Sequence, residues 1–167
     1  MVIILNLAAK EKKIHYNKNI VCLANSWRYP SGRCIAGKEI YDQGFGPWIR
    51  PVSKRKTREL NIRECSYSNG QIPKLLDIVK ITLEKNTPEG HQKENHLHNE
   101  DFFWEKVGIC SWGKLQQAID KPKGPLWYNG SSSTYGINDR VSVTYTSQLK
   151  SSLYLIKPNE FILNNNL

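Results

Sequence analysis

A run of cationic side chains at residues 50–63 is the part of the sequence best suited to bind a polyanion. It holds Arg50, Lys54, Arg55, Lys56, Arg58 and Arg63 against one acidic residue, Glu59. Lys and Arg neutralise phosphates and release counterions, so such a cluster gives an affinity for nucleic acid that falls as salt rises. Trp27 and Trp48, in the same half of the chain, offer platforms on which bases can stack. The alternative is a solvated loop that follows a strand, with Trp48 buried.

Cys34 lies between Arg33 and Lys38, two cations that would favour its nucleophilic thiolate form. A nucleophilic cysteine also needs a general base, and no His is close to it in the sequence. A lone cysteine on an apolar strand is more often a small buried hydrophobe, which is the role we expect here. The four cysteines form no C-x-x-C pair, so the sequence encodes neither a zinc knuckle nor a thioredoxin-type motif. Reduced cysteines favour a cytoplasmic protein.

The segment HQKENHLH, residues 91–98, collects side chains that could ligate a metal. His96 and His98 would share one side of an extended strand, and His91 or Glu94 could add a third ligand. The spacing matches no known zinc signature, so we predict no metal site. We instead expect a turn whose His and Asn side chains cap backbone groups.

A Ser- and Gly-rich stretch, LWYNGSSSTYGINDR at residues 126–140, is a candidate ligand loop. Its backbone N–H groups could form a nest for a phosphate beside a cation and two aromatic rings. The predicted ligand-loop residues are Trp127, Tyr128, Ser131, Ser132, Ser133 and Arg140. The stretch lacks the Gly-Lys-Ser/Thr ending of a P-loop, which argues against nucleotide hydrolysis. The alternative is a flexible loop between strands.

Short strands must position these candidate residues, because turn residues interrupt the chain at short intervals. Apolar or alternating runs predict strands at 19–24, 33–40, 48–53, 141–146 and 152–156, and the run at 76–83 predicts a strand buried on both faces. Residues 113–120 are the best helix candidate, and the polar stretch 86–103 is the longest candidate linker. The expected fold class is mainly β with short helices, in two tandem OB-like small β-barrels. We expect an N-terminal extension at 1–18, a first barrel at 19–88 and a second at 89–167, packed as one compact unit.

The composition fits a globular protein with a basic surface that could bind an acidic partner. The 167 residues are 39% hydrophobic, enough for one ordinary core or two small ones, and carry a formal net charge of +9. Residues 1–70 hold 13 Lys and Arg against five Asp and Glu, whereas residues 71–167 hold 11 against 10. A polyanion should therefore meet the first half of the chain. The apolar run after Met1 is short and no cation precedes it, so we expect neither a signal peptide nor a membrane span.

Several short strings follow one another in an order that is more specific than any one of them. They are IVCLANSWRYPSGRCIAGKE, WIRPVS, KLLDIVKI, HQKENH, WEKVG, LWYNGSSS, GINDRV and SSLYLIKP, and they run from about residue 19 to about residue 158. This succession resembles the prokaryotic dual OB-fold domain family. The resemblance implies two tandem OB-like barrels. It also implies an association with nucleic-acid or nucleotide binding and a protein partner in a bacterial conflict system, and it supplies no catalytic residues.

The predicted function is non-enzymatic binding of single-stranded DNA or RNA through a basic and aromatic face of the first barrel. The predicted nucleic-acid-binding residues are Trp27, Arg28, Arg33, Lys38, Trp48, Arg50, Lys54, Arg55, Lys56 and Arg58. The alternative is a sensor that holds a small ligand, such as a nucleotide or signalling molecule, between the barrels. The sequence nominates no pair of carboxylates for acid–base chemistry. We predict no catalytic residue, cofactor or membrane association.

Overall fold

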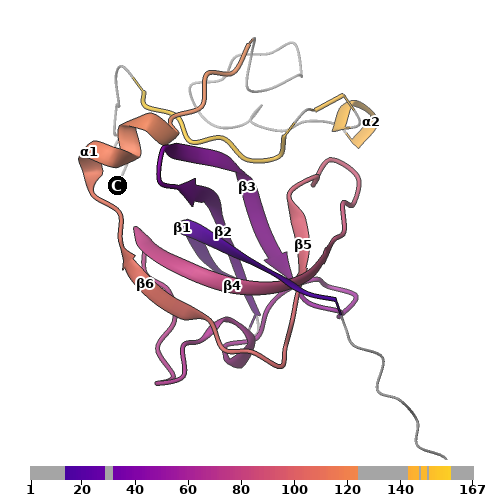
Figure 1. Ribbon diagram of the computed structural model, residues 1–167. Coiled ribbons are helices and arrows are strands. Elements are labelled where there is room, and N and C mark those ends of the chain that lie inside the picture. The colour runs from indigo at the N-terminus through magenta and orange to yellow at the C-terminus, as the bar shows by residue number, and fades with distance from the viewer. Residues whose placement is uncertain (1–13, 29–31, 124–142, 147, 150, 159–167) are drawn as a thin grey trace, which may run out of the picture.

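Six strands between residues 16 and 109 form one sheet that closes on itself (Figure 1). This computed structural model describes residues 14–28, 32–123, 143–146, 148–149 and 151–158. The strands are β1 (Tyr16–Arg28), β2 (Gly32–Tyr41), β3 (Gly44–Val52), β4 (Asp77–Asn86), β5 (Asn95–His98) and β6 (Glu105–Ile109). Their order is β1-β2-β3-β5-β4-β6, and β1 also pairs with β4, so the first five strands form a ring. The fold is mainly β, as predicted.

The register of the strands explains how the ring closes. β1 serves two neighbours, because its residues 16–21 pair with β4 and its residues 20–28 pair with β2. The β3–β5 pairing is parallel and sets Arg50 opposite Asn95, whereas the other pairings are antiparallel. Five strands with Greek-key connections are the architecture of an OB fold.

β4 shows the period-two pattern of a strand with one buried face. Val79, Ile81 and Leu83 point into the ring and are fully buried, while the residues between them are partly exposed. The sequence-based prediction that this strand is buried on both faces was therefore wrong for most of its length. On the outer face, Lys80 and Thr82 are partly exposed, whereas Ile78 packs against a second hydrophobic cluster.

The hydrophobic core fills the inside of the ring. It is built from Ile20, Cys22, Ile35, Ile49, Leu60, Cys65, Tyr67, Val79, Ile81, Leu83 and Trp104. Close packing extends to the backbone at Gly37 of β2, where an added Cβ would overlap the carbonyl oxygen of Val21 on β1. Only glycine fits this approach of the two strands.

A second hydrophobic cluster lies apart from this core and contains the helical segment that follows β6. The helical elements are η1 (Arg63–Cys65), α1 (Trp112–Leu115), η2 (Gln116–Ala118) and α2 (Val143–Thr146). Leu115 and Ala118 pack with Val21 of β1 and Cys110, and Ile40 of β2 packs against this cluster. The helix predicted at residues 113–120 is confirmed as α1 and η2. Figure 1 shows α1 beside the sheet, following directly after β6.

The predicted linker at residues 86–103 contains a buried strand, β5, which is a correction to the sequence-based assignment. The polar composition of the segment indicated a linker, but Asn95 and His98 of this strand are both buried. Asn95 satisfies its side chain inside the protein: its amide nitrogen donates to Gln92 and its amide oxygen accepts from Arg50. Buried polar groups are tolerated when they are hydrogen-bonded in this way.

Strands from both sides of residue 88 belong to the same sheet. β5 pairs with β3 and β4, and β6 pairs with β4. Two tandem barrels and a division at residues 88/89 remain predictions, because residues 124–142 and 159–167 lie outside the described residues.

Two strands expected near the end of the chain do not form where the chain is described. Residues 143–146 are the helix α2, and residues 151–158 contain no strand. The backbone bonds locally after α2, where the N–H of Gln148 donates to the carbonyl of Tyr145. Leu155 bonds through both its N–H and its C=O to a single residue, Asp120, instead of to a neighbouring strand.

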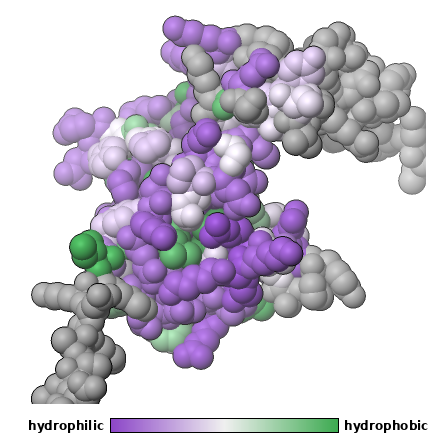
Figure 2. Space-filling view, turned by 90° about the vertical axis from the view of Figure 1, so that its right-hand side faces the viewer, coloured by the Kyte–Doolittle hydropathy of each residue, from purple (hydrophilic) through white to green (hydrophobic). Residues whose placement is uncertain are grey.

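The surface shown in Figure 2 is mainly hydrophilic, and its hydrophobic residues form small patches. This distribution fits a fold whose apolar side chains lie mostly in the ring interior and the second cluster. Within the described ranges, none of the helices has the length and apolar character needed to cross a membrane.

Candidate nucleic-acid interface

Four arginines line one hollow of about 120 Å³ at the place where β1 and β3 end and β2 begins. They are Arg28, Arg33, Arg50 and Arg58, and we call this site the arginine hollow. Its other lining residues are Cys34, Pro51, Val52, Thr57, Glu59 and Gln92. The side chains therefore come from three strands, from the loop after β3, and from the connection between β4 and β5.

Local backbone structure brings these segments together. Arg33 of β2 exchanges two backbone hydrogen bonds with Leu60, of 2.7 and 3.0 Å, which hold the loop after β3 against β2. Within that loop the N–H of Ser53 donates to the carbonyl of Arg58, which has a positive φ of 62°. This left-handed conformation is uncommon for a residue other than glycine, and it turns the chain back toward β2.

Arg50 is a largely but not fully buried member of the site, with its own protein partners. Its Nη2 lies 3.0 Å from Oε1 of Glu94, and its Nε donates to Oδ1 of Asn95 at 2.8 Å. The side chains of Arg50 and Glu94 are only 12% and 5% exposed. Ser152 donates a further hydrogen bond to Glu94. Arg50 therefore connects β3 to the start of β5 and is a largely buried part of the lining of the hollow.

The remaining cations of the hollow are held by weaker partners. Nε of Arg28 lies 3.0 Å from Glu59, and Nε of Arg58 lies 3.1 Å from Glu89. Arg28 and Glu89 are well exposed, at 63% and 60%, and their partners are partly exposed, so each pair contributes about 0 to 1 kcal/mol.

Trp27 stands beside the hollow as an exposed aromatic surface. Its side chain is 52% exposed, and the guanidinium of Arg33 lies 4.7 Å from the centroid of the ring. Arg33 also donates to Oδ1 of Asn25 at 3.3 Å, which helps to fix its guanidinium. Trp27 is therefore an exposed ring beside the hollow, and Arg33 connects it to the hollow.

Lys38 and Trp48 lie elsewhere, at the contact between the ring and residues 118–120. Nζ of Lys38 donates to the carbonyl of Ala118 at 2.7 Å and pairs with the carboxylate of Asp120. The indole Nε1 of Trp48 donates to the same carboxylate at 3.1 Å. Neither residue lines the arginine hollow. Trp48 instead lines a larger cavity of about 450 Å³, together with His96, Asp120 and Tyr154 among others.

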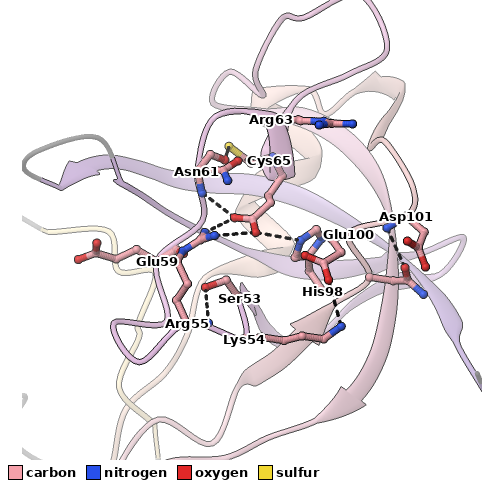
Figure 3. Close-up of polar contacts among 12 residues, drawn as sticks. Ser53, Lys54, Arg55, Glu59, Asn61, Arg63, Cys65, His98, Glu100 and Asp101 are labelled. Atoms are coloured by element: carbon pink, nitrogen blue, oxygen red, sulfur yellow. Dashed lines mark hydrogen bonds and ion pairs between the residues drawn. The ribbon is translucent and has the colours of Figure 1, made fainter.

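Lys54 and Arg55 point toward a group of acidic residues (Figure 3). Nζ of Lys54 lies 3.2 Å from Glu84 and 3.3 Å from Glu100. The guanidinium of Arg55 binds both carboxylate oxygens of Glu64. Neither cation lines the hollow, and each has an anionic partner. Lys56, in the same loop, is exposed to solvent.

Glu64 is the centre of this acidic group, and sequence reasoning missed it. Asn61 and Glu64 form a reciprocal capping box, in which each backbone N–H donates to the other side chain at 2.7 and 2.9 Å. Burial alone would raise the pKa of Glu64, but hydrogen bonds from Arg55 and Asn61 outweigh burial and lower it. The spacing of Asn61 and Glu64 was the signal that could have identified this cap.

His96 and His98 of the 91–98 segment contact other side chains of the protein. His96 shares hydrogen bonds with Tyr16, at 2.6 Å, and with Asn86. His98 is buried, its Nε2 lies 4.0 Å from Glu64, and burial lowers its pKa. The side chain of Asn86, which precedes this segment, donates to the carbonyls of Lys93 and Asn95. The hydrogen bonds of His96 and of the Asn95 side chain go to other side chains, so they are not the backbone caps that the sequence predicted. No group of three or more potential metal ligands occurs among the residues that the structure describes.

The other predicted residues fall into two groups. All four cysteines are free, and burial raises the pKa of Cys22 to about 12 and that of Cys65 to about 11, which suits inert core residues. Cys34 is half-buried in the arginine hollow. Trp127, Tyr128, Ser131, Ser132, Ser133 and Arg140 of the predicted ligand loop lie outside the described residues.

Comparison with known proteins agrees with this strand arrangement. The model of the dual OB-containing domain family matches residues 18–166, which is nearly the whole chain. No curated protein and no solved structure matches this chain. The match over this length shows that the chain belongs to the dual OB-containing domain family.

Proposed function

We propose that the protein binds single-stranded nucleic acid at the arginine hollow. Arg28, Arg33 and Arg58 contact phosphate, and Trp27 stacks a base. The observation that carries the proposal is the position of the hollow. OB folds bind oligonucleotides on the face of strands 2 and 3 and on the loops between strands 1 and 2 and strands 4 and 5. The hollow is lined by residues of β2 and β3 and by Gln92, between β4 and β5.

The chemistry of the site supports a polyanionic partner. Among the described residues, Arg28 and Arg58 are held by ion pairs that are partly open to solvent, so phosphates can replace Glu59 and Glu89 with little loss of free energy. The guanidinium fork matches the geometry of phosphate oxygens. An exposed Trp27 favours single strands, because bases in a duplex have no free face to offer the ring.

The proposed interface is narrower than the sequence-based set. Arg50 acts through the architecture of the hollow, because its charge is balanced by Glu94. Lys56 is exposed and can meet a phosphate further along the strand. Lys54 and Arg55 point toward Glu84, Glu100 and Glu64 and do not line the hollow. Lys38 and Trp48 lie at Asp120.

Fluorescence anisotropy of labelled single-stranded and double-stranded oligonucleotides at two salt concentrations tests the proposal. We expect tighter binding of the single strand and an affinity that falls with salt. The variant Arg28→Gln/Arg58→Gln should weaken binding and reduce the salt slope by about one for each phosphate that is no longer neutralised. Lys80→Gln/Lys114→Gln removes the same charge from residues that do not line the hollow, and serves as the control. Equal loss of affinity in both variants would contradict the proposed site.

The cavity beside Trp48 supports a second candidate, a sensor for a small ligand. Its volume of about 450 Å³ lies within the range of small-molecule sites, and Pro47, Trp48, Leu153 and Tyr154 give it apolar and aromatic walls. A nucleotide bound there should raise the melting temperature with little dependence on salt. The Arg28→Gln/Arg58→Gln variant should leave that stabilisation unchanged.

A further inference from the structure

The arginine hollow is small and partly enclosed by side chains from several segments. Its volume of about 120 Å³ can take one phosphate group. An internal phosphodiester is joined to a sugar on each side, so a strand that uses it must enter and leave the site. A terminal phosphate is joined to one sugar only and can be inserted from one direction.

The charge of the hollow also exceeds what a phosphodiester needs. The charge of Arg50 is balanced by the buried Glu94, and Arg58 pairs with Glu89, which does not line the hollow and whose side chain is 60% exposed. Once a ligand displaces Glu89, Arg28, Arg33 and Arg58 stand against Glu59 among the lining residues. This excess of two positive charges matches a phosphate monoester, which carries about −1.5 to −2 at pH 7 and three acceptor oxygens. A phosphodiester supplies only one negative charge.

The guanidiniums are held in place before a ligand arrives. Arg33 is fixed between the Trp27 ring and Asn25, and its Nε has no hydrogen-bond partner among the described residues. Arg50 is fixed by Asn95 and Glu94. Fixed donors lose little conformational entropy when they bind an anion, which favours a strong and specific contact. Because Arg33 touches both the hollow and Trp27, a phosphate in the hollow and a base on Trp27 can belong to the same end nucleotide.

We infer that the arginine hollow binds the terminal phosphate of a single strand, a phosphate monoester, with the end base stacked on Trp27. This inference rests on the proposed function and narrows its substrate class to phosphorylated strand ends. Glu59 is the internal competitor of this ligand, because its carboxylate pairs with Arg28 inside the same hollow.

The test compares three single strands of one sequence, about 12 nucleotides long and labelled internally. One carries a 5′-phosphate, one a 3′-phosphate, and one has hydroxyl groups at both ends. We expect one of the phosphorylated strands to bind at least tenfold more tightly than the hydroxyl strand. Arg28→Gln/Arg58→Gln should abolish this preference, whereas the control Lys80→Gln/Lys114→Gln should keep it.

The outcomes distinguish the inference from the proposed function on which it rests. No binding of any strand would overturn the proposed function itself. Equal binding of all three strands would overturn the terminal-phosphate inference and leave the proposed function standing. A preference that persists in Arg28→Gln/Arg58→Gln would place phosphate recognition outside the hollow and overturn the inference as well. Inorganic phosphate, compared with chloride at equal ionic strength, should compete only weakly; competition as strong as that of the phosphorylated strand would make free phosphate the ligand instead.

Discussion

Replacing one member of the Arg50–Glu94 pair should destabilise the protein much more than replacing both. The two side chains are almost fully buried, with an Nη2 to Oε1 distance of 3.0 Å. Arg50→Met leaves the carboxylate of Glu94 without its cationic partner, and Glu94→Leu does the same to the guanidinium. The double variant Arg50→Met/Glu94→Leu leaves no unpaired charge.

The expected magnitudes follow from this burial. Removing one partner of a buried ion pair costs about 3 to 5 kcal/mol. For a chain of this size, that corresponds to a fall in melting temperature of roughly 6 to 20 °C. The double variant still leaves Asn95 Oδ1 and the Ser152 hydroxyl without hydrogen-bond partners, so it should lose about 1 to 2 kcal/mol.

Urea unfolding of the wild type, the two single variants and the double variant measures the coupling directly. The exposed pair Lys80–Glu105 provides a control, in which Lys80→Met and Glu105→Leu should each change stability by less than about 1 kcal/mol. The buried-pair prediction is refuted if Arg50→Met and Glu94→Leu also lose less than about 1 kcal/mol, or if their losses simply add in the double variant. Small losses would mean that Arg50 is solvated and free to act as a phosphate ligand, and additive losses would mean that Arg50 and Glu94 are not energetically coupled.

Three further predictions concern binding, packing and pH. Glu59→Gln should tighten oligonucleotide binding roughly 1.5- to 5-fold, because a surface ion pair such as Arg28–Glu59 is worth about 0.2 to 1 kcal/mol. Glu105→Gln, away from the hollow, should change the affinity measured by anisotropy less. Gly37→Ala should lose more than about 3 kcal/mol in urea unfolding, because its Cβ has no space, and Gly113→Ala, with open space around it, should not. Burial lowers the pKa of His98, so the unfolded chain binds a proton more readily than the folded protein; the stability from neutral His98 should be complete above about pH 6.5 and decline as the pH falls below that value. Urea midpoints between pH 7.5 and 5 should show a smaller pH dependence in His98→Gln, and an unchanged dependence would exclude His98 as its source.

The sequence predicted the basic region but could not divide it into its parts. Residues 50–58 are neighbours in sequence, yet the turn that ends at Arg58 directs its side chain to the hollow while Arg55 faces Glu64. The turn depends on a positive φ at an arginine, and no Gly or Asn marked it. Local pattern therefore identified the cations, and backbone geometry decided which of them share a site.

Long-range partners were the other part that sequence reasoning could not supply. Trp48 was correctly placed in a strand, but its partner Asp120 lies 72 residues further along the chain. β5 was missed because Asn95 and His98 look like linker residues until their buried surroundings are known. Apolar periodicity specifies which face of a strand is inside, whereas polar pairs specify which segments meet, and single-sequence patterns contain little information about the latter.

The double pairing of β1 has a consequence for the order in which the chain can fold during synthesis. β1, β2 and β3 are consecutive and can pair as soon as residue 52 is available, because their contacts are local. The first half of β1 must wait for β4, since Tyr16 pairs with Leu83. Until then Ile20 and Cys22 lack their packing partners from β4, and one edge of β1 has unpaired backbone groups that can bind other strands. Non-local closure of this kind is slow, so the nascent chain should remain vulnerable to aggregation and proteolysis until about residue 98, when β5 completes the ring.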